Sequence, residues 1–452
     1  MINMKDRDYD VALIGSGPTN LWAADELIRS DPRLKVAIFE KNNFSSGGMI
    51  NDCKLNLSHK IGVDLDELKI PEEYAHGLIE IVDQRFLYFG ADPYVSGTNE
   101  EEVNKWVEKA ERSGVELIAC RQRHIGTDQA KVIVEKFRQD LESKFVEFYM
   151  QTNVKDIQKK DDVFQLFTDS GEFRAKYVLC APGRDGAYWL RDLAGRLGVK
   201  YRWGPVDIGV RLEVRKEVYD PITNIIYDPK FVLKTKCHGD KVRTFCSNPG
   251  GRVRLEPSAV NGFKLINGDA LKKHKTPNTN FAILNTVDLT QPYADTTEMA
   301  RNIAIDANRM GGGRPLVQRM GDFLEGRRSK TETFFDRAMG YDLIMPTLKP
   351  GLPPEGSVTP GDINLAYKAR IMNNLKESFE RLNRILYGIT NPATLIYAPE
   401  IKFYDTKYKT NKNLETNVAN FFVAGDGAGK SRGIVWAAGT GIIAARGILD
   451  KL

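Results

Sequence analysis

The sequence has little of the residue types that carry metal and disulfide chemistry. Its 452 residues include only five cysteines and five histidines. These form no CxxC, no CxxxxC and no HExxH or similar ligand pattern. We therefore expect reduced, mostly buried thiols and no metal site.

Long hydrophobic runs and an export signal are also lacking. The longest apolar-rich stretch, Gly433–Ala445, holds three glycines and is shorter than the roughly 20 residues that cross a membrane. The first residues, MINMKDRDYD, contain no apolar core of a signal peptide. These absences predict a cytoplasmic protein without a membrane partner.

Charge of one sign is not in large excess. The 65 basic and 60 acidic residues leave a net charge of +5 that is spread along the chain, so no nucleic-acid partner is expected. Hydrophobic residues make up 42% of the chain, and there is no low-complexity tract. This composition and length predict two or three folded domains.

The N-terminal region contains a glycine-rich turn between an apolar run and a helical pattern. Residues 11–15, VALIG, predict a buried strand, and Pro18 suits the first turn of the helix that LWAADELI predicts. A second apolar run, KVAIFE, ends at Glu40. In this β-α-β unit Gly15 would make the turn, Gly17 would let a pyrophosphate approach the helix N-terminus, and Glu40 would accept from ribose hydroxyls.

One position departs from the GxGxxG fingerprint. Asn20 stands where the third glycine usually lets the helix pack closely on the strand, so looser or tilted packing is expected there. A glycine turn can also be only a turn. Because the strand, proline, helix, second strand and terminal acid all agree, they favour nucleotide binding.

The middle of the chain has a different pattern. The runs VEFYMQT (146–152) and KYVLCAPG (176–183) predict two more strands of the first sheet, and a helix is expected over 128–143. Residues from about 200 to 390 contain short strand candidates, Pro-rich connections and a long charged helix near 365–387. This region predicts an inserted α+β domain.

The C-terminal segment again predicts a strand, a glycine turn and a helix. Ala424–Ser431 resembles a relaxed P-loop, which would indicate a nucleotide hydrolase. Only 21 residues follow Ser431, so the other hydrolase strands would have to come from upstream. The alternative is that Asp426 hydrogen-bonds a ribityl hydroxyl and the last helix directs its positive N-terminus at a flavin.

Several motifs together resemble a known group. They are GSGPTNLWAA at the start, KLNLS after the Gly47-Gly48 pair, HIGTD at 124–128, CAPGR at 180–184, FCSNPGG at 245–251, NTNFAIL at 278–284 and GDGAGKSRGI at 425–434. In this order, and over nearly the whole chain, they resemble the FAD-dependent dehydrogenases of the glutathione-reductase-type flavoprotein superfamily. The resemblance implies an α/β fold, with a Rossmann-like FAD-binding domain built from both chain ends (1–195 and 390–452) and an inserted α+β substrate domain (196–389).

The resemblance also implies which residues hold FAD. The pyrophosphate would meet the first glycine turn, at Gly15, Gly17, Pro18, Thr19 and Asn20. The adenosine half would meet Glu40, Lys41, Val154, Ala181 and Gly183. The remainder of the cofactor would be bordered by Gly48 and Met49 and would meet the C-terminal segment at Gly425, Asp426, Gly433 and Ile434.

Two absences narrow the implied chemistry. Disulfide reductases of the superfamily carry CxxxxC where this chain has only Cys53, and the other glycine cluster, Gly311–Gly313, follows a helical pattern instead of the strand that a NAD(P)H domain needs. We therefore expect an oxidoreductase, not a disulfide reductase, that transfers a hydride to or from a small organic substrate. Its electrons would come from the substrate, from transient NAD(P)H or from a protein redox partner. A non-catalytic flavoprotein subunit is a further alternative.

Candidate catalytic residues carry weaker signals. Lys54, expected to pass the flavin, would hydrogen-bond the flavin or hold a substrate anion, or else be a solvated lysine. Three further charged residues would contact a substrate or form surface ion pairs: Glu400, Lys430 and Arg432. Arg252 and Arg254 would bind an acidic group or charge a strand edge.

Overall fold

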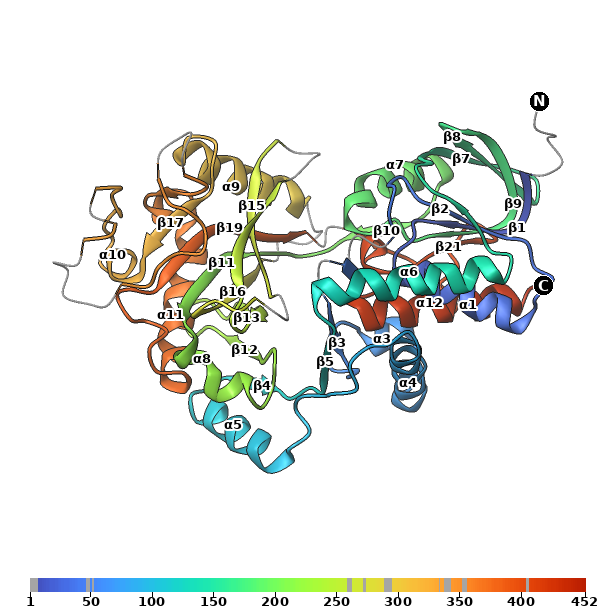
Figure 1. Ribbon diagram of the computed structural model, residues 1–452. Helices are drawn as coiled ribbons and strands as arrows, with labels where there is room; N and C mark the ends of the chain where they lie inside the picture. Colours follow the sequence, from blue (N-terminus) through green and yellow to red (C-terminus); the bar gives the residue numbers. More distant parts are fainter. Residues whose placement is uncertain are drawn as a thin grey trace. The chain divides into compact units, whose positions relative to one another are not determined.

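The N-terminal and C-terminal segments of the chain lie in the same unit of the computed structural model (Figure 1). Unit 1 comprises Met1–Tyr94, Arg123–Gly204 and Thr406–Leu452, and unit 2 comprises Val95–Gln122 and Pro205–Asp405. The structure describes residues 7–45, 49–50, 53–257, 262–270, 274–287, 295–332, 334–336, 343–351, 356–403 and 406–452.

Unit 1 is built on one seven-stranded sheet of order β6-β2-β1-β9-β8-β7, in which β21 also pairs with β9. Its strands are β1 (Asp8–Ile14), β2 (Val36–Phe39), β6 (Glu147–Tyr149), β7 (Val154–Lys160), β8 (Val163–Thr168), β9 (Gly171–Cys180) and β21 (Phe421–Val423). The strands β6, β2, β1, β9 and β21 run parallel, whereas β8 is antiparallel to both of its neighbours. The sheet is therefore parallel at its centre and ends in an antiparallel meander.

The strands of this sheet form where the apolar runs predict them. The runs that begin near residues 11, 35, 146 and 176 become β1, β2, β6 and β9, and all four lie in one sheet as expected. The C-terminal strand β21 returns to the same sheet beside β9. The predicted α/β class with a parallel sheet is thus confirmed, and strands from both ends of the chain lie in that sheet.

Helices cover both faces of this sheet. They are α1 (Pro18–Ser30), α3 (Leu65–Leu68), α4 (Glu72–Tyr88), α6 (Thr127–Ser143), α7 (Ala187–Leu197) and α12 (Ile434–Leu449). Alternate residues of β1 face opposite sides. Val11 and Leu13 join the apolar cluster that includes residues of α1, α4, α6 and α12, whereas Ala12 and Ile14 join the cluster that includes residues of α7.

The two helices from opposite ends of the chain pack directly on each other, as the red α12 beside the blue α1 shows in Figure 1. A Cβ atom on Gly441 of α12 would lie 1.9 Å from the backbone oxygen of Thr19. Only glycine permits this approach. The small residues of the last helix therefore let it make close contact with α1.

Two small strand pairs complete unit 1. The strand β10 (Tyr201–Trp203) pairs with β20 (Thr406–Tyr408), and β3 (Lys54–Asn56) pairs with β5 (Gln122–His124). The first pair brings together segments about 200 residues apart in the sequence.

Unit 2 is built on an eight-stranded, mainly antiparallel sheet of order β18-β17-β19-β11-β16-β13-β12-β4. Its strands are β4 (Glu116–Ile118), β11 (Val206–Arg215), β12 (Lys230–Lys234), β13 (Lys241–Asn248), β16 (Asn278–Val287), β17 (Leu316–Arg319), β18 (Thr359–Pro360) and β19 (Leu395–Phe403), and a separate hairpin consists of β14 (Arg252–Pro257) and β15 (Lys264–Asp269). The helices are α5 (Glu100–Arg112), α8 (Lys216–Thr223), α9 (Thr296–Met310), α10 (Met320–Leu324) and α11 (Ala369–Ile385).

Unit 2 contains the elements that the sequence predicts for the middle region. The long charged helix is α11, and the glycine cluster at 311–313 directly follows α9, not a strand. Two segments outside the predicted range 196–389 also belong here. Residues 95–122 join because β4 pairs with β12, and residues 395–403 join because β19 pairs with β11 and β17.

Within the described residues, no helix combines the length and the apolar character that crossing a membrane requires.

Candidate cofactor-binding site

The candidate site of unit 1 lies where its parallel strands end. The strands β2, β1, β9 and β21 are neighbours and run the same way, so the loops that follow them meet at one edge of the sheet. These loops begin at Glu40, Gly15, Ala181 and Ala424. In open α/β sheets, ligands bind at this carboxyl-terminal edge.

Glycines let these loops pack against one another without side chains between them. A Cβ on Gly15, whose φ is +96°, would lie 2.7 Å from the oxygen of Ala181. A Cβ on Gly427 would lie 2.3 Å from the oxygen of Gly183. The N-terminal and C-terminal glycine turns are therefore tied to the same turn after β9.

Three other glycines at this edge face open space. A Cβ added to Gly17, Gly183 or Gly433 would meet no atom of the described residues within 4 Å. Gly17 is the N-cap of α1 and Gly433 is the N-cap of α12. Because glycine has no capping side chain, neither helix N-terminus is covered by a side-chain cap, although Pro18 of α1 has no N–H and the Asn20 N–H donates to the Gly17 oxygen. A nucleotide cofactor fits this glycine-lined edge.

Asn20 stands where the fingerprint usually has its third glycine, and its side chain has a specific role in the turn. Its side chain is fully buried, and its Nδ2 donates to the backbone oxygens of Ile14 at 2.8 Å and Gly15 at 2.7 Å. The amide thereby binds the end of β1 to the first turn of α1. Thr19, beside it, is buried against Gly425, whose added Cβ would lie 2.5 Å from the Thr19 hydroxyl oxygen.

Glu40 connects the loops after β1 and β2. Its Oε2 accepts from the backbone N–H of Ser16 at 3.0 Å and from the Ser16 hydroxyl at 2.7 Å. Its Oε1 accepts from the backbone and side-chain nitrogens of Asn42 at 2.9 and 2.8 Å. The sequence analysis missed Ser16 and Asn42, although both are polar residues within two positions of the predicted motif. These four hydrogen bonds fill the roughly four acceptor positions of the carboxylate, so a ribose hydroxyl would have to take the place of one of these donors.

The remaining residues predicted for the adenosine half lie around these loops. Lys41 is exposed next to Glu40. Val154 is the first residue of β7 and follows Thr152 by two positions; the backbone N–H of Thr152 donates to the backbone oxygen of Glu40 at 2.8 Å. Ala181 is buried, and Gly183 is exposed. Met49 is fully buried in the apolar core, and Gly48 lies outside the described residues.

Asp426 organises the turn that leads into α12. Its Oδ1 accepts from the Ser431 hydroxyl at 2.9 Å, and its Oδ2 accepts from the backbone N–H of Gly433 at 3.3 Å. Burial raises the pKa of Asp426, although the Arg184 guanidinium and these two hydrogen bonds oppose the shift. The carboxylate thus lies beside the N-terminus of α12, where Ile434 begins the helix.

This turn differs from a P-loop in two respects. In a P-loop the Lys-Ser pair opens the helix and leaves the hydroxyl for Mg²⁺. Here α12 begins only at Ile434, and the Ser431 hydroxyl donates to Asp426. The geometry therefore favours the interpretation in which Asp426 and the helix N-terminus face a cofactor.

Lys430 is buried, not part of a surface ion pair. Its side chain is 3% exposed, and its Nζ lies 3.6 Å from Oε1 of Glu67. Burial lowers the pKa of Lys430, and the attraction of Glu67 opposes the shift. Glu67 also pairs with Lys407 at 2.8 Å and with Arg202 at 3.5 Å. One carboxylate thus faces three cations, a cluster that the sequence analysis missed because its members lie in α3, β10, β20 and the turn before α12.

Lys54 is also buried, which excludes the interpretation of Lys54 as a solvated lysine. It opens β3 and is 4% exposed. Its neighbour Cys53 places its Sγ 3.6 Å from Nε2 of His124. Arg432 is partly exposed, and its backbone N–H donates to the oxygen of Gly62 at 2.7 Å.

The other charged candidates belong to unit 2. Glu400 is fully buried and accepts from Arg211 through both carboxylate oxygens at 2.7 Å, so it does not form the expected surface ion pair. Arg252 on β14 is half exposed and pairs with Asp269 at 3.0 Å. Arg254 lies two positions farther along the same strand.

Comparison with known proteins adds a family match to this geometry. Residues 205–402 match the family described as "FAD-dependent protein, C-terminal domain-like". The matched range nearly coincides with the larger segment of unit 2. The chain is also 26% identical over 349 residues to an "Uncharacterized protein" of Clostridium beijerinckii. This alignment covers 73% of the chain, which spans 62% of the length of that relative.

Two solved structures align with nearly the whole chain at low identity. Glycine oxidase from Geobacillus kaustophilus has 14% identity and a TM-score of 0.43, and the alignment covers 98% of this chain and 95% of that one. L-Proline dehydrogenase from P. horikoshii has 13% identity and a TM-score of 0.45, with 98% and 94% covered.

Proposed function

We propose that this protein is an FAD-dependent oxidoreductase of the glutathione-reductase type that transfers a hydride to or from a small organic substrate. The observation that carries the proposal is the packing of glycine turns from both ends of the chain at the carboxyl-terminal edge of one parallel sheet. The family match over residues 205–402 supports the same cofactor from an independent part of the chain.

Each part of the edge has a proposed place in cofactor binding. The open Gly17 and the N-terminus of α1 would receive the pyrophosphate, and Glu40 would accept from the adenosine ribose. Asp426 would accept from a ribityl hydroxyl, and the partial positive charge of the α12 N-terminus would stabilise negative charge on the ring. Bound FAD supplies the two-electron chemistry, whereas these residues bind and orient it.

The charged cluster around Glu67 gives this part of unit 1 a local excess of positive charge. Lys430, Lys407 and Arg202 outnumber the one carboxylate that they share. We propose that Lys430 contributes to the potential that attracts an anionic substrate or electron donor, because buried cations act through a low-dielectric medium.

The first experiment measures flavin content. Gly17→Leu fills the open space of the proposed cradle, and its φ of −75° is compatible with leucine. We expect the wild-type protein to carry about one FAD per chain and the variant to lose most of it while keeping its far-ultraviolet circular dichroism. Gly195→Leu is the matched control, because an added Cβ there also meets no atom within 4 Å but lies on α7.

The second experiment measures electron transfer. Anaerobic addition of NADH, NADPH or candidate organic donors should bleach the visible flavin spectrum for at least one of them. A wild-type preparation that stays colourless with added FAD would contradict the proposal. Magnesium-dependent ATP hydrolysis that disappears in Lys430→Ala would instead support the P-loop interpretation. A bound flavin that no donor reduces would favour a non-catalytic subunit.

A further inference from the structure

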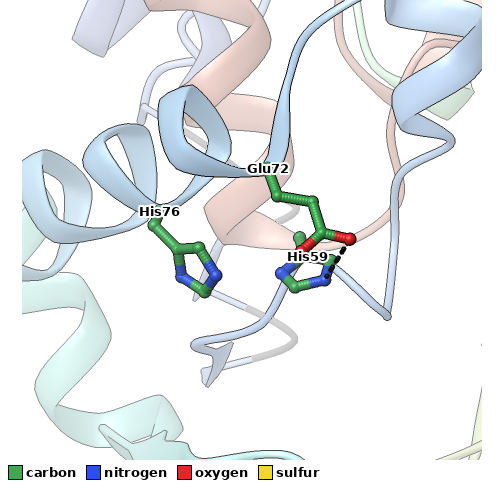
Figure 2. A group of neighbouring side chains, drawn as sticks. All are labelled: His59, Glu72 and His76. Carbon is green, nitrogen blue, oxygen red and sulfur yellow. Dashed lines mark ion pairs between the residues drawn. The ribbon is translucent and has the colours of Figure 1, made fainter.

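Three potential metal ligands converge at the start of α4 in unit 1. They are His59, which precedes α3, and Glu72 and His76, which lie four positions apart on one face of α4. Figure 2 shows the Glu72 carboxylate and both imidazole rings on the same side of the first turns of this helix. The sequence analysis expected no metal site because these residues form no HExxH pattern and lie apart in the chain.

The distances between the ligand atoms are close to those that a metal requires. One ligand atom from each residue lies within 4.8 Å of the others, and Nε2 of His59 lies 3.7 Å from Oε1 of Glu72. Four ligands at the usual zinc distances of about 2.0–2.1 Å stand roughly 3.3 Å from one another in a tetrahedron. Side-chain rotations that bring the ligand atoms closer by up to about 1.5 Å would therefore close the site, and Glu72 and His76 are exposed and can make that adjustment.

His59 has features of a ligand that is held in place in advance. Its side chain is 15% exposed, and its Nδ1 is buried without a hydrogen-bond partner among the described residues. The two imidazole rings lie 4.9 Å apart at 81°, so neither ring covers the nitrogens of the other by stacking. The segment is anchored on both sides of His59. Nε1 of Trp436 donates to the Ser58 oxygen at 2.9 Å, and Arg432 donates to Gly62.

We infer that His59, Glu72 and His76 bind a divalent transition metal of the zinc class. Two imidazoles and one carboxylate form a ligand set that zinc takes with three protein ligands, which leaves a fourth position for water. The metal would clamp the segment 58–62 to α4, and that segment contacts the residues just before and within α12. The inference does not depend on the proposed function, because none of the three residues belongs to the proposed FAD edge.

The test is calorimetric titration of Zn²⁺ into the full chain after treatment with a chelator. All variants are made in a Cys237→Ser background, since the Cys237 thiol lies 3.1 Å from the His238 ring and that pair can take up zinc itself. We expect one zinc to bind per chain in the micromolar range or tighter. His76→Ala and Glu72→Gln should weaken binding at least tenfold, and both positions are exposed, so the variants should fold normally.

A second readout separates this site from scattered surface binding. Zinc should raise the thermal unfolding temperature of the Cys237→Ser protein and should not raise that of its His76→Ala derivative. His274→Ala is the control, because it removes an exposed histidine of unit 2 and should leave both measurements unchanged. The inference is overturned if the Cys237→Ser protein takes up no stoichiometric zinc, or if His76→Ala and Glu72→Gln bind it as tightly as their parent.

Discussion

The two units place their buried charges in different parts of their sheets. In unit 1, Glu40 and Lys430 lie beyond the ends of parallel strands, in or beside the glycine turns, and the strand interiors are apolar. In unit 2, Arg211 lies in the middle of β11 and Glu400 in the middle of β19, and both are fully buried. The seven-stranded sheet of unit 1 therefore has these two charges beyond the ends of its strands, whereas the sheet of unit 2 buries Arg211 and Glu400 within its strands.

The alternation along β11 explains how unit 2 tolerates these charges. Ile208, Val210, Leu212 and Val214 face one apolar cluster, and the residues between them, including Arg211 and Glu213, face the other side. On that side Asn280 accepts from Arg211 at 2.8 Å, and Tyr397 donates to Glu213 at 2.6 Å. Burial raises the pKa of Glu213, although the hydrogen bonds from Tyr397, Asn278 and Thr347 oppose the shift. Hydrogen-bond partners for its charged groups are what permit this buried polar layer.

Arg211→Met is the change expected to test this contrast most strongly. It leaves the buried Glu400 with one ion-pair partner among the described residues, Lys402 at 3.3 Å. We expect the free energy of unfolding of unit 2 to fall by about 3–5 kcal/mol, the usual cost of breaking a buried pair. Urea unfolding measures it. Arg174→Met is the control, because its pair with Asp8 in unit 1 is largely exposed and should contribute less than about 1 kcal/mol. If the two changes lowered the free energy of unfolding equally, the buried pair of unit 2 would stabilise the protein no more than an exposed pair.

Gly441→Ala tests the close packing on which the edge of unit 1 depends. The new Cβ would lie 1.9 Å from the Thr19 oxygen, so α1 and α12 must separate. We expect a loss of about 1–3 kcal/mol in stability, together with weaker flavin binding. Thermal unfolding and visible absorbance measure the two effects.

Gly195→Ala on α7 is the matched control for this change. Its added Cβ meets no atom within 4 Å, and alanine should stabilise the helix by up to about 1 kcal/mol. If both alanines were tolerated equally, close contact between the terminal helices would not be required.

Lys430→Met is expected to have the smallest effect on stability, and the effect should depend on pH. Because the folded state lowers the pKa of Lys430, the unfolded chain binds more protons between that lowered pKa and the ordinary value of 10.5. The stability of the wild type should therefore rise with pH in this window, relative to the variant. Unfolding midpoints at several pH values measure the difference.

Lys176→Met is the control of opposite sign. The hydrogen bond to Asp10 raises the pKa of Lys176, so its stabilisation is present below pH 10.5 and is lost as the pH rises through the raised value. If the stability difference from wild type changed with pH in the same direction for both variants, Lys430 would not be the buried cation that we describe.

Local patterns predicted much of unit 1 correctly. The apolar runs near residues 11, 35 and 176 specify strands because each is buried on both faces, and Pro18 begins α1 as expected. The clusters were not predictable in this way. Lys407 meets Arg202 only because β20 pairs with β10, and His59 meets His76 only because the segment before α3 lies against the start of α4.

By itself, the sequence determined the parallel sheet, the two glycine turns and the small residues of the last helix, because these depend on interactions within a few residues and on the burial of whole runs. Only the tertiary structure decided the pairing of Arg211 with Glu400, 189 positions away, and the burial of Lys430. Charged side chains look alike in a sequence. Their pKa values and contributions to stability depend on solvent exclusion and on partners that strand order brings together.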